Sequence, residues 1–150
     1  QALECDGFEA RVPEDIHAAM WSKLIGVSPG GAVGAVTRTP GLYWRDVPEA
    51  LSMYEEAARE VFDVARARGI ALEQQLLSDL AGWLNSMPVT SMMSMQRDIM
   101  AGQPSELEAQ VGAVQRLGAE AGVPTPVYTS IYRSLLPSEM KARGQIDFEG

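Results

Sequence analysis

The sequence contains a single cysteine, Cys5, and a single histidine, His17, among its 150 residues. One cysteine cannot form an internal disulfide, and this fits a reducing cytoplasm, although a secreted protein without disulfides would share the feature. We therefore expect a cytoplasmic protein. The histidine could act as a proton shuttle, but without a visible partner it is more typical of an ordinary surface or core residue. No metal site is expected.

Positive charge is also scarce, because the sequence has 12 Lys and Arg residues against 20 Asp and Glu residues, which gives a net charge of −8. The basic residues are scattered, whereas phosphate binding requires a clustered excess of them, so we expect no nucleic-acid partner. No apolar run approaches the ~20 residues of a membrane span. The N-terminus lacks a charged start followed by an apolar stretch. We expect a soluble, unprocessed chain without a membrane partner.

What the chain does have is the composition of one folded domain, with 46% hydrophobic and 21% charged residues. Residues 1–12 alternate weakly between apolar and polar positions, which predicts a connecting segment or an edge strand. Residues 13–150 are dominated by helical patterns. We expect about five helices, no convincing strand pair and no internal repeat, and hence an all-α domain.

The first predicted helix runs from about Glu14 to Ile25, because a proline and two acids suit its first turn. Four glycines and Pro29 follow within the apolar stretch 26–36. Such a stretch predicts a kinked or broken helix packed closely against its surroundings. Tight helix packing and close approach of a ligand both remain open as the reason for the glycines.

Further helices follow from caps and from apolar spacing. Asp46 is predicted to cap a long amphipathic helix that stops at Gly69, with Glu49 completing the cap. Residues 73–86 are expected to form the next helix, whose buried face carries Leu76, Leu77, Leu80 and either Trp83 or Leu84.

The last part of the chain begins with an irregular segment, 87–95, whose methionines suit adaptable packing better than metal binding. A short helix at 96–101 is expected next. Ser105 and Glu108 then predict a capping box for a helix that ends at Gly122. A final helix is expected to start at the prolines of 124–126 and to be disrupted by Pro137.

Three residues are candidates for chemistry on local grounds. Lys23 precedes the glycine-rich stretch, and a lysine partly removed from water can donate a proton near neutral pH, yet a solvated lysine has the same pattern. Ser94 can bind a polar ligand group or cap the next helix. Glu106 lies in a first helical turn, where an acid needs no further function because the helix dipole favours it.

Several blocks in order resemble one known family. They are 21–25 (WSKLI), 31–38 (GAVGAVTR), 94–98 (SMQRD), 102–108 (GQPSELE), 112–114 (GAV) and 122–126 (GVPTP). Together they are similar to the C-terminal domain of ketopantoate reductases (2-dehydropantoate 2-reductases), which serve pantothenate biosynthesis. The resemblance implies a helical bundle like the C-terminal domain of 6-phosphogluconate dehydrogenase. It also implies that a Rossmann domain for NADPH belongs upstream, because this chain has no G-x-G-x-x-G turn of its own.

The resemblance also assigns roles to the three candidates. Lys23 matches the lysine that polarises the reacting carbonyl, while Ser94 and Glu106 match the substrate-binding serine and glutamate. A cation aimed at an oxygen that gains negative charge lowers the barrier to hydride transfer. The family usually carries asparagines where this chain has Val27 and Gly31. A more apolar 2-keto acid than ketopantoate is therefore expected, and the chain alone is expected to be inactive.

A second hypothesis is a non-catalytic helical module that binds a partner or forms a homodimer. The glycine-rich stretch and the methionine-rich segment suggest it, because exposed apolar patches mark interaction sites. The two hypotheses are compatible, since related enzymes often dimerise through this domain.

Overall fold

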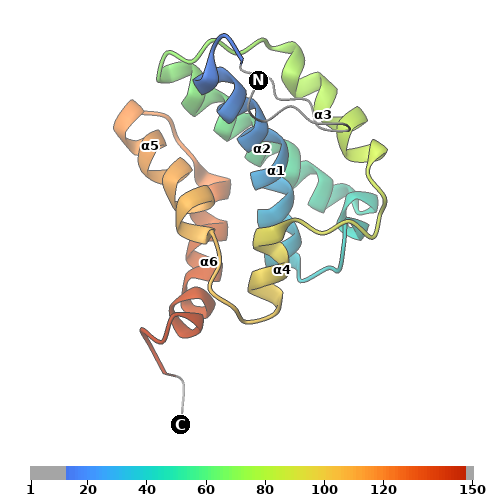
Figure 1. Cartoon of the computed structure of the whole chain (residues 1–150), viewed down its shortest axis with the longest axis vertical. Coiled ribbons are helices and arrows are strands. Elements are labelled where there is room, and N and C mark those ends of the chain that lie inside the picture. Colours follow the sequence, from blue (N-terminus) through green and yellow to red (C-terminus); the bar gives the residue numbers. More distant parts are fainter. Residues whose placement is uncertain (1–12, 148–150) are drawn as a thin grey trace, which may run out of the picture.

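The computed structural model describes residues 13–147, so the connector expected at residues 1–12 lies outside the described residues. The described part is all-α and contains no strand, which confirms the predicted fold class (Figure 1). Its elements are α1 (Ile16–Thr37), η1 (Tyr43–Asp46), α2 (Pro48–Ala67), α3 (Gln75–Ser86), α4 (Ser94–Met100), η2 (Glu108–Gly112), α5 (Ala113–Ala121) and α6 (Pro126–Ala142).

The sequence predicted a kinked or broken helix that packs closely at residues 26–36. Helix α1 continues through this glycine-rich stretch, so the break is wrong, whereas the close packing is confirmed. It begins where Asp15 accepts a hydrogen bond from the backbone N–H of Ala18, at 2.9 Å, and it ends at Arg38. Pro29 removes only one backbone donor, and the helix is buried on all sides around it. A helix that is apolar all round is stabilised by its neighbours, and this tertiary packing overrides the low helix propensity of the glycines.

The start of α2 also differs from the prediction. Asp46 closes the short 3₁₀ turn η1 and does not cap α2, which begins at Pro48 without any side-chain cap. Proline suits a first helical position because its missing N–H has no partner there in any case. The end of α2 is as predicted, since Gly69 follows it with a φ of +81°. A glycine adopts this left-handed conformation without the steric cost that other residues meet.

The last helix, α6, runs through Pro137 to Ala142, so the disruption predicted at this proline did not occur. An internal proline costs a helix about 3 kcal/mol. Here the turn that follows it is held from outside, because Glu139 and Arg143 both bind Ser105. These long-range contacts keep the helix intact beyond the proline.

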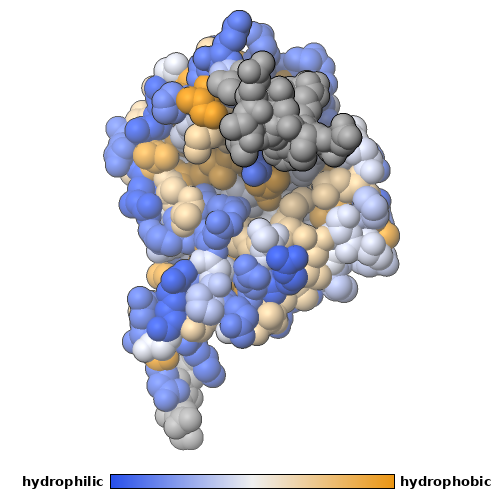
Figure 2. Space-filling view, in the orientation of Figure 1, coloured by the Kyte–Doolittle hydropathy of each residue, from blue (hydrophilic) through white to orange (hydrophobic). Residues whose placement is uncertain are grey.

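Helix α1 lies at the centre of the fold, with α2, α4 and α6 packed around it (Figure 1). One core therefore unites the helices, with large buried side chains that include Trp44, Tyr54 and Tyr128. The face in Figure 2 is hollowed between α5 and α1, and hydrophobic residues lie in the hollow. Among residues 13–147, no helix combines the length and the hydropathy needed to cross a membrane.

Candidate functional site

Lys23 is exposed on α1 and lines a pocket between α1 and α3. The pocket has a volume of about 370 Å³, within the range of small-molecule sites. Within the described range 13–147, the ammonium of Lys23 has no hydrogen-bond or ion-pair partner. Because Lys23 is exposed among residues 13–147, only groups other than these residues, such as a ligand or another domain, could shield its ammonium from water. Nothing in this described part of the chain competes with a ligand oxygen for the ammonium of Lys23.

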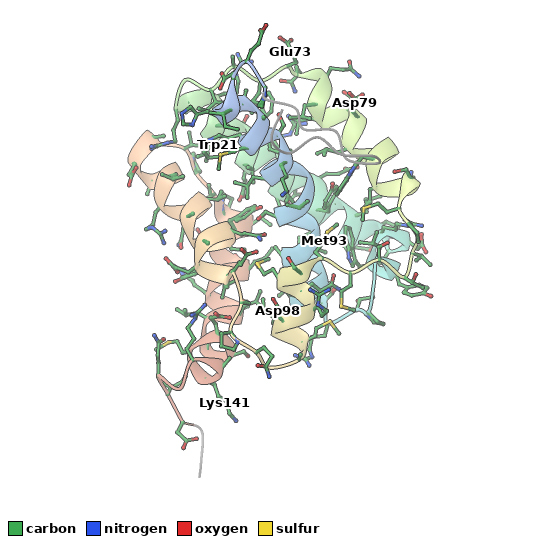
Figure 3. The ribbon with its side chains drawn as sticks, in the orientation of Figure 1. Trp21, Glu73, Asp79, Met93, Asp98 and Lys141 are labelled. Carbon is green, nitrogen blue, oxygen red and sulfur yellow. The ribbon has the colours of Figure 1, made fainter. Side chains whose placement is uncertain are left out.

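Ser94 is the first residue of α4, and its exposed side chain does not cap the helix. Its two neighbours lie against the glycines of α1. A Cβ placed on Gly30 would be 3.4 Å from Cε of Met93, and one placed on Gly31 would be 3.2 Å from Cε of Met95. Figure 3 shows Met93 beside α1. The glycines thus bring the segment that carries Ser94 close to the helix that carries Lys23.

The closest approach is between Gly34 and Gln96, where an added Cβ would lie 2.4 Å from the carboxamide carbon. The buried amide of Gln96 donates to the carbonyl oxygens of Thr39, at 2.7 Å, and Gly41, at 3.1 Å. A buried amide keeps its geometry when its donors are satisfied, because leaving them unpaired is costly. Gln96 therefore fixes α4, and with it Ser94, relative to the end of α1.

Glu106 lies just before η2, is exposed, and accepts a hydrogen bond from Gln110 Nε2 at 2.8 Å. The residue before it is held from α6. Glu139, only 5% exposed, accepts hydrogen bonds from the backbone N–H of Ser105, at 3.0 Å, and from its hydroxyl, at 2.6 Å. Arg143 binds the Ser105 carbonyl at 2.6 Å and Glu139 at 2.7 Å. This charge-assisted network fixes the backbone that presents Glu106.

The capping box predicted for this helix is half confirmed. The Ser105 hydroxyl accepts from the N–H of Leu107 at 3.1 Å, as a cap does. The Glu108 carboxylate, however, does not accept a hydrogen bond from the backbone N–H of Ser105, as a capping box requires. It binds Arg116 and the hydroxyl of Tyr132 instead. The hydrogen bond to this carboxylate raises the pKa of Tyr132. The element that begins at Glu108 is a π-helical turn, a form that is frequent at functional sites.

The three candidate residues occupy neighbouring parts of the fold without touching one another. Lys23 and Gly31 are separated by eight residues of helix, or ~12 Å along the axis, and the two methionines that flank Ser94 in the sequence lie against Gly31. Glu106 precedes η2, which also packs against α1. All three side chains are exposed. In the described part of the chain, no hydrogen bond or ion pair joins them.

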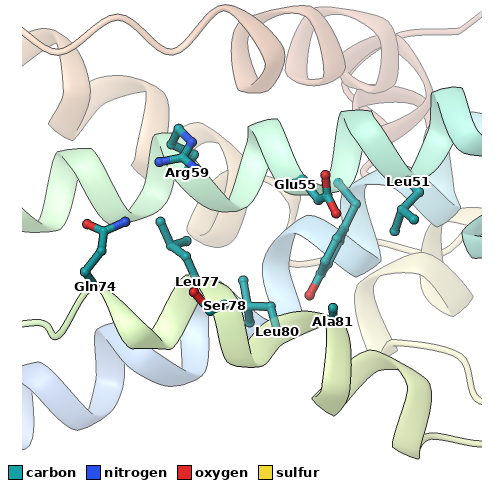
Figure 4. A pocket seen from close by; sticks show the side chains of 9 residues that line it. Leu51, Glu55, Arg59, Gln74, Leu77, Ser78, Leu80 and Ala81 are labelled. Atoms are coloured by element: carbon teal, nitrogen blue, oxygen red, sulfur yellow. The ribbon is translucent and has the colours of Figure 1, made fainter.

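A second pocket, of about 260 Å³, lies between α2 and α3 (Figure 4). Glu55 and Arg59 line it from α2, while Gln74 and Ser78 face them. It contains none of the three candidate residues. The buried hydroxyl of Tyr54, which also lines this pocket, has no hydrogen-bond partner in the described structure.

Sequence reasoning missed two parts of the site. Trp83 was one of two alternatives expected for the buried face of α3, but Leu84 fills the core and Trp83 is 36% exposed in the pocket beside Lys23. The positions Leu76, Leu80 and Leu84 recur every four residues and could have identified the core face. The contact between Glu139 and Ser105 had no such signal, because 34 residues separate the two.

Comparison with known proteins shows the family to which this domain belongs. The family described as ketopantoate reductase PanE/ApbA, C terminal, matches residues 15–138. The 2-dehydropantoate 2-reductase of Pyrobaculum aerophilum is 28% identical over 139 residues, which are 93% of this chain and 50% of that protein. The enzyme of the same name from Caulobacter vibrioides is 32% identical over 118 residues, or 79% of this chain and 40% of that protein.

A solved structure also has this fold. It is that of a dimeric ketopantoate reductase from Staphylococcus aureus, with a TM-score of 0.81 and 24% identity over 87% of this chain and 46% of that one. The chain therefore belongs to the ketopantoate reductase family and corresponds to its C-terminal domain. It spans about half the length of the curated relatives that it matches.

Proposed function

We propose that this chain is the substrate-binding half of an NADPH-dependent reductase that converts a 2-oxo acid into a 2-hydroxy acid. The observation that supports this most directly is the placement of Lys23, whose exposed ammonium has no partner within residues 13–147 and stands at the rim of a pocket. Ser94, whose hydroxyl has no hydrogen-bond partner within the described residues, and Glu106 lie on segments that pack near the other half of α1. All three match the family by position.

The chemistry assigned to these residues follows from their charges. When hydride reaches the carbonyl carbon of a 2-oxo acid, negative charge builds on the carbonyl oxygen. The ammonium of Lys23 stabilises this charge and can deliver the proton that completes the hydroxyl group. The hydroxyl of Ser94 suits the substrate carboxylate as a donor. The carboxylate of Glu106 suits a hydroxyl group as an acceptor, including the hydroxyl that the reduction forms.

NADPH, when bound, supplies the hydride for this reaction. The described residues contain neither a strand nor a glycine-rich phosphate turn, so they do not build a dinucleotide site themselves. We place that site in a Rossmann domain upstream of Gln1, joined through residues 1–12 as an interdomain connector. A coding sequence for a βαβ unit immediately upstream would support this arrangement, and one without a glycine-rich turn would contradict it.

The test uses the complete protein encoded with this upstream region. We expect NADPH oxidation with at least one 2-oxo acid, and we expect Lys23→Ala to lower kcat/KM by ~10²–10⁴-fold, the usual contribution of such a residue. Lys141→Ala is the matched control, because the second lysine of the chain lies in the last turn of α6. Absence of 2-oxo acid reduction with both NADPH and NADH would overturn the proposal.

A second candidate function is assembly, and it is compatible with the first. Ile16 is 54% exposed and Met20 is 62% exposed, and both lie on the side of α1 that carries Lys23. Large apolar side chains left open in this way favour a partner surface, either a second copy or the upstream domain. Sedimentation of the complete protein should show a dimer. A strictly monomeric particle would leave the upstream domain as the occupant.

A further inference from the structure

The pocket beside Lys23 is apolar over most of its wall. Val27 and Gly26 contribute from α1, and Leu76, Leu80 and Trp83 contribute from α3. Gly26 is what opens it, because its missing side chain leaves room in front of the indole. A Cβ at this position would already lie 3.7 Å from the Trp83 ring. Any longer side chain would enter the pocket.

Two polar residues that line the pocket, Ser22 and Asp79, each make one hydrogen bond to a residue of their own helix. The hydroxyl of Ser22 donates to the carbonyl of Ala18 at 2.8 Å, and Asp79 accepts a hydrogen bond from Gln75 at 2.9 Å. The ammonium of Lys23 has no partner within residues 13–147, and the exposed carboxylate of Asp79 keeps further acceptor sites. The remaining hydrogen-bonding capacity therefore lies with these two charged groups rather than with the apolar wall. A hydroxyl group placed deep in this pocket would lose its hydrogen bonds to water without replacement, and such a loss strongly disfavours binding.

The charge of Asp79 and the position of Ser94 together indicate how a substrate would be oriented in the pocket. Asp79 stands on the α3 side of the pocket, where Figure 3 shows it, and it repels a carboxylate on that side. Ser94 lies in the other direction along α1, beyond Gly31. A 2-oxo acid whose carbonyl oxygen meets Lys23 therefore has its carboxylate toward Ser94 and its carbon substituent toward Trp83.

We propose that the α1–α3 pocket binds the apolar side chain of the substrate, so that the enzyme acts on 2-oxo acids with branched or aromatic side chains rather than hydroxylated ones. This inference depends on the proposed reductase function. The volume of about 370 Å³ is sufficient for a ring or a branched alkyl group. The indole of Trp83 supplies a flat face on which such a group can pack.

The first experiment compares substrates on the complete protein. We expect kcat/KM for 4-methyl-2-oxopentanoate to exceed that for pyruvate by roughly 50-fold, because it carries three more carbons and each buried methylene contributes about 4-fold. Phenylpyruvate, which buries a larger apolar group, should exceed pyruvate by at least as much. Ketopantoate, which carries a hydroxyl, is expected to fall below both of these apolar substrates. Calorimetric titration with 3-phenyllactate and lactate, without dinucleotide, should show the same preference in binding.

The second experiment alters the pocket. Gly26→Leu fills it and should lower kcat/KM for phenylpyruvate at least 10-fold more than it lowers kcat/KM for pyruvate. Gly82→Leu is the matched control, because a Cβ there meets nothing within 4 Å. Trp83→Ala removes the flat wall without adding bulk, and it should lower the phenylpyruvate value selectively.

The outcomes separate the two proposals. If no 2-oxo acid is reduced, the reductase function itself is wrong. If ketopantoate or pyruvate is reduced at least as well as phenylpyruvate, the function stands and the pocket assignment is overturned. Equal losses for all substrates in both Gly26→Leu and Trp83→Ala would also overturn it.

Discussion

The hydroxyl of Tyr128 donates a hydrogen bond to Oγ of Ser28, 2.9 Å away and one hundred residues earlier in the chain. Both residues are fully buried, so this bond joins α6 to the central helix α1 inside the core. Burial raises the pKa of Tyr128, which keeps the hydroxyl protonated and able to donate. The contact is one of the longest-range constraints on the fold.

Tyr128→Phe should lower the free energy of unfolding by about 1–2 kcal/mol, because it leaves the buried Ser28 hydroxyl without this partner. Tyr54→Phe is the matched comparison, since its buried hydroxyl has no hydrogen-bond partner in the described structure. Loss of that group should leave stability unchanged or raise it by up to about 1 kcal/mol. Urea denaturation of both variants measures the difference, and equal destabilisation would contradict it.

Gly34→Ala should destabilise the domain by about 2–3 kcal/mol, because the added methyl group collides with the Gln96 carboxamide and that amide cannot move without losing its hydrogen bonds. Gly82→Ala provides the opposite case on α3, where the methyl group meets open space. It should stabilise the helix by up to about 1 kcal/mol. Thermal unfolding of the two variants should therefore shift in opposite directions.

Glu139→Ala should lower stability by about 2–3 kcal/mol, because it leaves Ser105 and Arg143 without the carboxylate that they share. In the complete enzyme it should also raise KM, since Glu106 loses its fixed backbone. Arg133→Ala is the control, because this exposed residue of α6 is expected to matter by less than about 0.5 kcal/mol. An unchanged KM in Glu139→Ala would show that the network is structural only.

Glu60 should make stability depend on pH in the direction opposite to that of most carboxylates. Burial raises its pKa above the ordinary value, and the hydrogen bonds from Tyr128 and Val127 only partly offset this. The folded state therefore holds the proton more tightly than the unfolded state. The contribution of Glu60 to the free energy of unfolding is greatest below its unfolded pKa, and it decreases as pH rises through the raised pKa of the folded state.

Glu60→Gln tests this dependence, because the variant cannot titrate at this position. The free energy of unfolding of the wild type minus that of Glu60→Gln should be largest near pH 4 and should fall as pH rises, until the carboxyl is ionised in both states. Chemical denaturation between pH 4 and pH 7 gives the curve. A difference that increases with pH would mean that the fold favours the carboxylate.

The sequence predicted elements where the cause is local, and it failed where the cause is distant. The end of α2 at Gly69 and that of α5 at Gly122 follow from a glycine that adopts a positive φ. The continuity of α6 across Pro137 depends instead on Glu139 and its contacts 34 residues away, which no local pattern contains. Local propensity therefore indicated the helices but not what holds them together.

The same distinction applies to the site. Lys23, Ser94 and Glu106 were found by their order along the chain and their likeness to a family. Their assignment as substrate ligands remains a prediction. The role of the glycines in α1 was left open between packing and ligand approach. The structure shows packing at Gly34, while the approach of a ligand at Gly26 stays a prediction. Gly34 is filled by Gln96, whereas Gly26 faces the pocket beside Trp83.

The unbroken course of α1 has a mechanical consequence. Lys23 near one end and Gly34 near the other belong to a single rod with no joint between them, and the rod is packed on several sides. A displacement of either end of α1 must therefore move the whole helix, because a close-packed interior has low compressibility and transmits strain. The position of Lys23 and the packing of α4 against α1 are for this reason mechanically coupled.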